Sequence, residues 1–212
     1  KIWYPMQDGH RGQQSYILDG ANTGTGGAEV VLNADFSDNE PADQARLVGG
    51  LQFANWNEDA NEYADRGLKK FTLIPGGIRC DILEQSENTW NQRIYSDVLS
   101  LTEGQSYRFT AEIRATPINL NRFNCWVESA SSKDPNPYPE HQHYPGSEEF
   151  LLVNKVFTYA ADTTTEDPNV TGNQVIHLYP SEDMPAGSFW EARNISVKAI
   201  NDKHHATTVF LG

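Results

Sequence analysis

Three side chains that could do chemistry alternate along one short segment, Asn124, Trp126 and Glu128, with apolar residues between them. Successive side chains of a β-strand point to opposite faces, so these three share one face while the apolar residues meet a core. An aromatic plane can stack on the C–H groups of a sugar, and a flanking carboxylate and amide can bond to its hydroxyl groups. The segment therefore predicts a binding face. A second interpretation is that residues 129–149 cover Trp126 in a secondary core.

The rest of the chain supplies strands that could position this face. Residues 106–115 alternate strictly, with Tyr107, Phe109, Ala111 and Ile113 on the apolar side. About ten such short segments are separated by Gly- and Pro-containing turns, no segment has the apolar period of a long helix, and aromatic residues make up 11% of the chain. This pattern predicts an all-β fold, a jelly-roll β-sandwich of two antiparallel sheets.

The composition also divides the chain. We predict that residues 1–28 form an extended N-terminal arm and a connector rich in Gly and Thr. Residues 29–201 are then the sandwich, and residues 202–212 are a C-terminal tail. A Pro-rich loop over 129–149 carries Tyr138 and Tyr144, which could wall a groove or pin the loop by packing. We expect each of these tyrosines to be a candidate ligand contact.

The net charge and hydropathy of the chain narrow the classes of partner. The net charge of −13 argues against nucleic acid, because most of the surface would repel a phosphate backbone. No apolar stretch of about 18 residues is present, so we expect no membrane insertion.

The two cysteines, Cys80 and Cys125, both fall on the apolar side of strand-like segments. They could form a disulfide or remain two buried thiols that pack as small apolar groups. The sequence leaves both alternatives open.

The order of several motifs resembles the carbohydrate-binding modules of the family 4, 9 and 22 type over about residues 30–200. The motifs are Leu32-Asn33-Ala34-Asp35-Phe36-Ser37, Trp56, Trp90-Asn91-Gln92-Arg93-Ile94, the segment 101–115, and Asn194-Ile195-Ser196-Val197. The resemblance implies a jelly-roll domain that binds a polysaccharide or glycan without catalysis. It also implies a protein that is extracellular or exposed on a surface.

The resemblance adds specific residues to the candidate site. Gln92 and Arg93 occupy positions that often face ligand in such modules. Members of this type often carry a structural calcium ion near the sandwich termini. The closing strand here departs from the paired aspartates of many members, since Arg193 and Asn194 stand there. Asp35 and Glu191 are then the expected calcium ligands.

Two alternatives belong to other classes of protein. The first is a structural subunit of an extracellular filament or virus particle that self-assembles through its N-terminal arm, by adding a strand to a neighbour. The second is a jelly-roll polysaccharide lyase, which the segments Glu112-Ile113-Arg114 and Gln174-Val175-Ile176-His177 partly match. In that case His177, near Tyr179, would act as a base.

Overall fold

The computed structural model describes residues 27–43, 47–58, 67–85, 92–116, 123–127, 143–159, 175–180 and 184–200, together with the backbone of two short segments, 17–18 and 205–206. Within these residues the secondary structure consists of β-strands, which confirms the predicted all-β class. At Trp126 and His143 the description is limited to the backbone.

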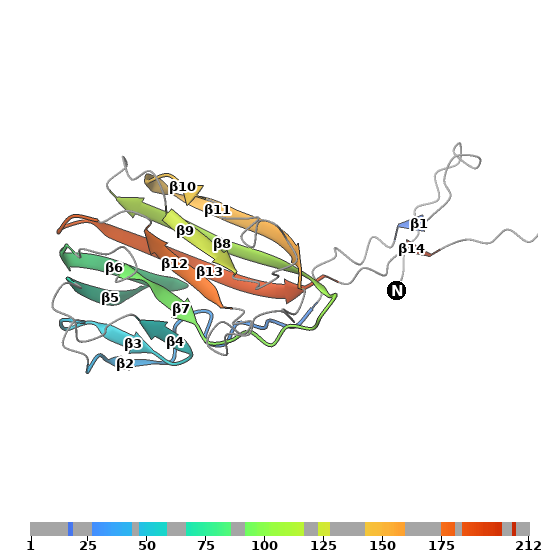
Figure 1. Ribbon diagram of the computed structural model, residues 1–212, viewed down its shortest axis with the longest axis horizontal. Helices are drawn as coiled ribbons and strands as arrows, with labels where there is room; N and C mark the ends of the chain where they lie inside the picture. Colours follow the sequence, from blue (N-terminus) through green and yellow to red (C-terminus); the bar gives the residue numbers. More distant parts are fainter. Residues whose placement is uncertain are drawn as a thin grey trace, which may run out of the picture.

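The strands form two five-stranded antiparallel sheets packed face to face (Figure 1). The front sheet has the order β10 (His143–Tyr144), β9 (Phe123–Val127), β12 (Ile176–Pro180), β7 (Ile94–Ser96) and β4 (Trp56–Glu58). The back sheet has the order β11 (Ser147–Thr158), β8 (Ser106–Thr116), β13 (Phe189–Ala199), β6 (Gly77–Glu84) and β5 (Leu68–Ile74). A β2 (Asn39–Pro41) and β3 (Leu51–Phe53) pair completes the globular part.

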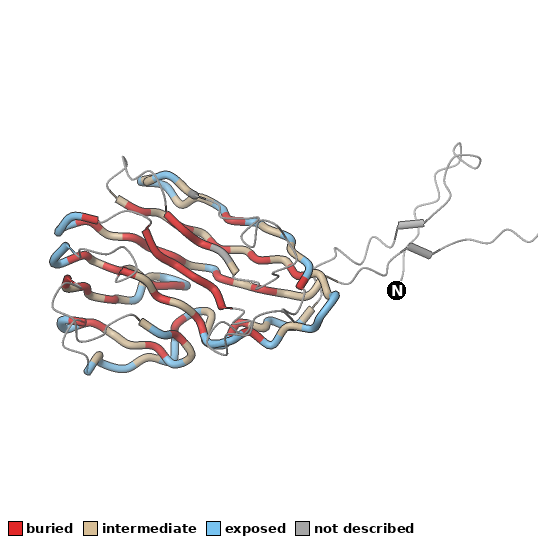
Figure 2. Tube along the Cα trace, viewed as in Figure 1, coloured by how far each residue is buried: buried red, intermediate tan, exposed pale blue. Residues whose placement is uncertain are grey.

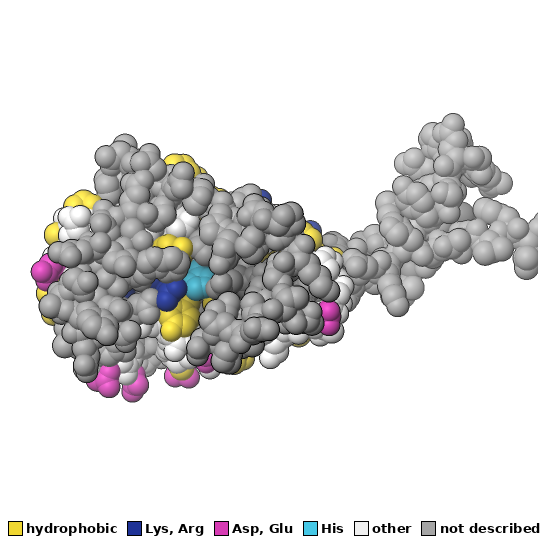
Figure 3. Space-filling model, in the orientation of Figure 1, with side chains coloured by type: hydrophobic (Ala, Val, Ile, Leu, Met, Phe, Trp, Pro, Cys, Tyr) yellow, Lys and Arg dark blue, Asp and Glu magenta, His cyan; other side chains and the backbone are white. Residues whose placement is uncertain are grey.

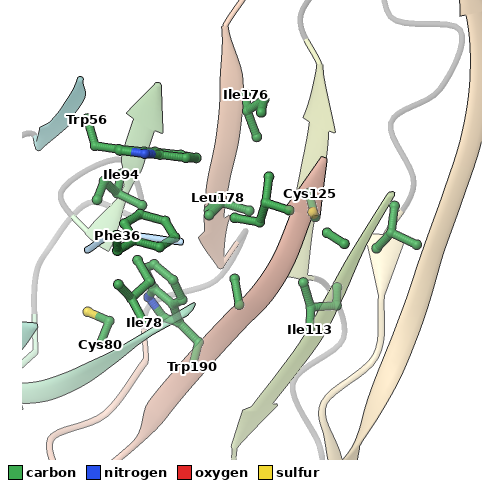
Figure 4. Close-up of a cluster of buried hydrophobic side chains, with 14 of the residues drawn as sticks. Phe36, Trp56, Ile78, Cys80, Ile94, Ile113, Cys125, Ile176, Leu178 and Trp190 are labelled. Carbon is green, nitrogen blue, oxygen red and sulfur yellow. The ribbon is translucent and has the colours of Figure 1, made fainter. Parts of the chain in front are cut away.

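The core lies between the two sheets, where the buried residues of Figure 2 gather. In β8 every second side chain from Tyr107 to Ala115 is buried, as the alternation predicts. Phe123 and Cys125 of β9 are buried as well. Aromatic rings fill one end of the core. The ring centroids of Phe36 and Trp56 are 4.6 Å apart (Figure 4), and those of Phe71 and Trp190 are 5.8 Å apart.

The two cysteines belong to opposite sheets, Cys80 to β6 and Cys125 to β9. Both are free and buried, and burial raises the pKa of both thiols. A thiol that stays protonated in an apolar setting reacts poorly. The structure therefore corresponds to the alternative of two buried thiols.

The first residues of the sandwich are fastened to its last strand. The Glu29 carboxylate accepts hydrogen bonds from the Val197 amide at 2.7 Å and the Ser196 hydroxyl at 2.6 Å. Close by, Gly27 packs so tightly that an added Cβ would lie 2.6 Å from the Ala199 carbonyl oxygen. This attachment holds residues 27–29 against β13.

Most of the predicted arm and tail lies outside the described residues. Within the chain, β1 (Ile17–Leu18) pairs with β14 (His205–Ala206), so a part of the arm meets a part of the tail. No helix in the described ranges has the length and apolar character needed to cross a bilayer.

Candidate functional site

The outer face of the front sheet carries a row of polar and aromatic positions. Alternation turns Trp56, Ile94 and Leu178 into the core, so their strand neighbours point outward. The register places Asn57 opposite Tyr95, Tyr95 opposite His177, and His177 opposite Trp126. Four positions from four different strands thus form one line across the sheet.

A second outward row lies beside the first. Asn124 of β9 is paired with Tyr179 of β12 on one side and with His143 of β10 on the other. Arg93 precedes β7, and its guanidinium carbon lies 4.8 Å from the centroid of the Tyr95 ring. We call Tyr95, His177, Tyr179, Asn124 and Arg93 the aromatic platform.

The rings of the platform lie within contact range of one another. The centroids of Tyr95 and His177 are 6.1 Å apart with an interplanar angle of 31°, and those of His177 and Tyr179 are 6.4 Å apart at 79°. His177, Tyr179 and Asn124 are buried, whereas Tyr95 and Arg93 are half-buried. Figure 3 shows a histidine, a basic side chain and hydrophobic side chains together at the centre of this face.

The predicted site residues fall in different places. Asn124 and Arg93 belong to the platform, and the backbone of Trp126 lies in its first row. Glu128 and Tyr138 lie outside the described residues, as does the Trp126 side chain. Residues 143–144 and 147–149, expected in a loop, are strand residues instead.

Gln92 and Tyr144 point inward rather than to the platform. Gln92 is 2% exposed, and its amide group bonds to the backbone oxygen and amide of Met184 at 3.4 and 3.3 Å. Tyr144 is paired with the buried Phe123 and packs against the core. Both side chains therefore have structural contacts.

Sequence reasoning missed three platform residues, Tyr95, His177 and Tyr179, and also Asn57 of the first row. A signal for them exists in the alternation, because Tyr95 lies between the buried residues Ile94 and Ser96. His177 and Tyr179 were considered only for the lyase alternative. Their place beside Tyr95 depends on strand pairing between distant segments, which alternation does not reveal.

A pocket of about 480 Å³ adjoins the platform, between β4 and the β2–β3 pair. Tyr95 and Asn57 belong to both the first row and the pocket wall. Asp38, Glu40 and Glu58 also line the pocket. We call this hollow the edge pocket, since β4 is the last strand of the front sheet in the described part of the chain.

The residues expected to bind calcium are engaged with other partners. The Glu191 carboxylate bonds to Arg79 at 3.2 Å and to Arg114 at 2.5 Å, one guanidinium for each oxygen. The exposed Asp35 accepts the Ser37 hydroxyl at 2.9 Å, which lowers the pKa of Asp35. Two arginines on one carboxylate do not fit a calcium ligand. Among the described residues no three His, Cys, Asp or Glu side chains are grouped to hold a metal.

No protein-family model matches the sequence, and no curated protein matches it significantly. Solved structures do resemble the fold. A family 4 carbohydrate-binding module is 14% identical, with a TM-score of 0.52 over 80% of this chain and 99% of that chain. The fold is that of a jelly-roll carbohydrate-binding module.

Two further structures resemble the chain with lower TM-scores. A family 16 carbohydrate-binding module is 12% identical at a TM-score of 0.47, over 79% of this chain and 98% of that chain. The second cellulose-binding domain of a Cellulomonas fimi β-1,4-glucanase is 16% identical at 0.43, over 84% and 99%.

Proposed function

We propose that the protein is a non-catalytic carbohydrate-binding module that holds a polysaccharide or glycan on its aromatic platform. The observation that supports this most is the cross-strand row in which Tyr95, His177 and the Trp126 position adjoin. The half-buried Tyr95 ring can stack on a sugar unit, and the half-buried Arg93 can bond to its hydroxyl groups. Such a role fits a protein that meets its ligand outside the cell.

A separation of residues supports the non-catalytic part of the proposal. The lyase alternative needs Glu112 and Arg114 to converge with His177. Glu112 and Arg114 lie on β8 of the back sheet, where they bond to Arg193 and Glu191 on its outer face. His177 lies on the outer face of the front sheet. The two motifs therefore occupy opposite surfaces of the sandwich.

The test is a glycan array followed by affinity gel electrophoresis with the polysaccharides that bind. Wild type is compared with Tyr95→Ala and Trp126→Ala, after thermal unfolding shows that each variant is folded. We expect binding to weaken by about tenfold or more, because truncating a central aromatic contact costs on the order of 2 kcal/mol.

Phe150→Ala is the matched control, since Phe150 lies on the back sheet under the guanidinium groups of Arg114 and Arg193. It should bind like wild type. Equal binding by wild type and both platform variants would reject the platform as the site. Failure of wild type to bind any glycan, together with fibres or particles in electron micrographs, would support the assembly alternative instead.

A further inference from the structure

The edge pocket continues the platform past the last described strand of the front sheet. Asn57 of β4 and Tyr95 of β7 face each other in the first row, and both line the pocket. The opposite wall comes from the β2–β3 pair, with Asp38, Glu40 and Gln52. A sugar chain lying along the row would reach this hollow next, so the pocket is placed to hold one further unit.

Hydrogen bonds between side-chain amides and carboxylates hold the polar groups of the pocket in place. The Gln52 amide donates to Glu40 Oε1 at 2.8 Å, and the Asn57 amide donates to Asp97 Oδ1 at 2.8 Å. The first pair leaves further acceptor sites on the Glu40 carboxylate of the wall, and the second fixes the Asn57 side chain. Sugar hydroxyl groups can donate to such oxygens. The wall therefore suits a ligand rich in hydroxyl donors.

The negative charge of the pocket wall disfavours a sugar unit that carries an acid group. The exposed carboxylates Asp38 and Glu40 line the pocket, and none of the lining residues that the structure describes is Lys or Arg. Arg93, over the Tyr95 ring, is not part of this wall. A uronic acid unit would bring its own carboxylate against these groups and lose water without gaining a cation.

We propose that the edge pocket accepts a sugar unit without an acid group and rejects a uronic acid, so that the protein selects uncharged polysaccharides over acidic ones. This inference rests on the proposed function, because it assumes that the sugar chain reaches the pocket from the platform. It adds a basis for selectivity that the platform alone, with its arginine, does not provide.

The test compares polysaccharides that share a backbone and differ in charge. Hydroxyethyl cellulose is paired with carboxymethyl cellulose, and highly methyl-esterified pectin with polygalacturonate, in affinity gels at fixed salt. A glycan array carrying uncharged and uronic forms of other backbones covers the remaining sugars. Wild type should bind the uncharged member of a pair at least tenfold more tightly than the acidic member.

The double variant Asp38→Asn, Glu40→Gln removes two charges from the wall and keeps the side-chain shapes. We expect it to raise affinity for the acidic member about tenfold and to change affinity for the uncharged member less than threefold. Glu148→Gln, Glu149→Gln is the matched control, because it changes the net charge equally at exposed positions of β11. This control should keep the wild-type preference.

The outcomes separate the two proposals. Wild-type binding that is as strong for the acidic member, or an equal gain in the pocket variant and the control, would overturn the inference about the pocket. In either case, loss of binding in Tyr95→Ala would leave the proposed function standing. If Tyr95→Ala and Trp126→Ala bind as wild type does, or no glycan binds at all, the proposed function fails and the inference fails with it.

Discussion

At the scale of single residues, Glu58 is a half-buried acid whose carboxylate charge is poorly compensated. Both of its carboxylate oxygens are buried and have no hydrogen-bond partner among the described residues. Burial raises the pKa of Glu58 from 4.5 to about 7, although Lys69 favours the charged form. The folded protein thus holds a proton on Glu58 at pH values where the unfolded chain has released it.

The raised pKa of Glu58 should make the unfolding free energy depend on pH. The folded-state pKa of Glu58 is raised, so the stability cost of its buried carboxylate is absent below about pH 4.5, grows as pH rises to about 7, and is constant at higher pH. A shift of that size corresponds to about 3 kcal/mol of lost unfolding free energy. Urea denaturation at pH 5, 6, 7 and 8 should show the loss in wild type and a flatter profile in Glu58→Gln. Parallel profiles for the two proteins would contradict the assignment.

Glu191 should be essential for stability rather than for binding calcium. Its side chain is 3% exposed and bonds to two arginines that are each 32% exposed. We expect Glu191→Ala to reduce the unfolding free energy by about 3 kcal/mol, because two guanidinium groups lose their buried partner. Glu112→Ala, which breaks the more exposed pair with Arg193, should cost less than about 1 kcal/mol.

Chelation distinguishes this role from a metal site. If Glu191 held calcium, EDTA would lower the melting temperature of wild type and have no effect on Glu191→Ala. We expect no such difference between the two proteins. Thermal unfolding of both, with EDTA and with added calcium, makes the comparison.

Gln92 and Arg93 show how far the resemblance to carbohydrate-binding modules predicts which side chains face a ligand. It suggested that Gln92 and Arg93 both face ligand, yet neighbours along a strand point to opposite sides. Ile94 is buried, so the same alternation turns Gln92 inward and Arg93 outward, as the structure has them. Periodicity, applied to this segment, would have separated the two.

At the scale of elements, alternation predicted strands better than their ends or partners. The segment 106–115 appears as β8 with the expected buried face. In contrast, β11 begins at Ser147 and includes Glu148 and Glu149, within the segment 129–149 that its prolines predicted to be a loop. Charged side chains are tolerated there, since β11 is the outermost described strand of its sheet.

The turn before β2 provides a prediction at this scale. Asn33 has a φ of +48°, its amide donates to the carbonyl oxygens of Asp38 and Ala54 at 2.8 Å each, and its Oδ1 accepts the Asp38 amide at 3.0 Å. Asn33→Ala should reduce the unfolding free energy by about 2 kcal/mol. The substitution removes these hydrogen bonds, and alanine tolerates a positive φ less well than asparagine does. Urea denaturation measures the change.

Asp35→Ala is the control in the same turn. Its carboxylate is exposed and bonds locally to Ser37, so its loss should cost less than about 1 kcal/mol. Equal effects of the two substitutions would mean that Asn33 does not hold the turn.

At the scale of the whole molecule, the fold was predictable and the site only in part. The order of short motifs along the chain indicated a jelly roll, and the family 4 structure confirms it. The first platform row joins Tyr95, Trp126 and His177, which are far apart in sequence and meet only through the pairing of β7, β12 and β9. Since one sequence carries no direct signal for such pairing, the aromatic positions could be predicted strand by strand but not as one surface.

The sandwich should fold and bind without the ends of the chain. The core between the two sheets is built from residues 31–197, and Glu29 fastens its start to β13. A chain limited to residues 27–200 should therefore unfold cooperatively, within about 5 °C of the full chain, because it keeps every core residue that the structure describes. It should also keep the affinity of the full chain for the best glycan of the array.

The same truncation tests whether the arm serves assembly. The pairing of β1 with β14 occurs within one chain, which favours a monomer in both forms. Light scattering coupled to size exclusion should then give one monomer mass for the full chain and one for the truncated chain. Oligomers that form only with the full chain would show that the arm and tail exchange this strand pair between copies, since a short two-stranded pairing can be made between chains as well as within one.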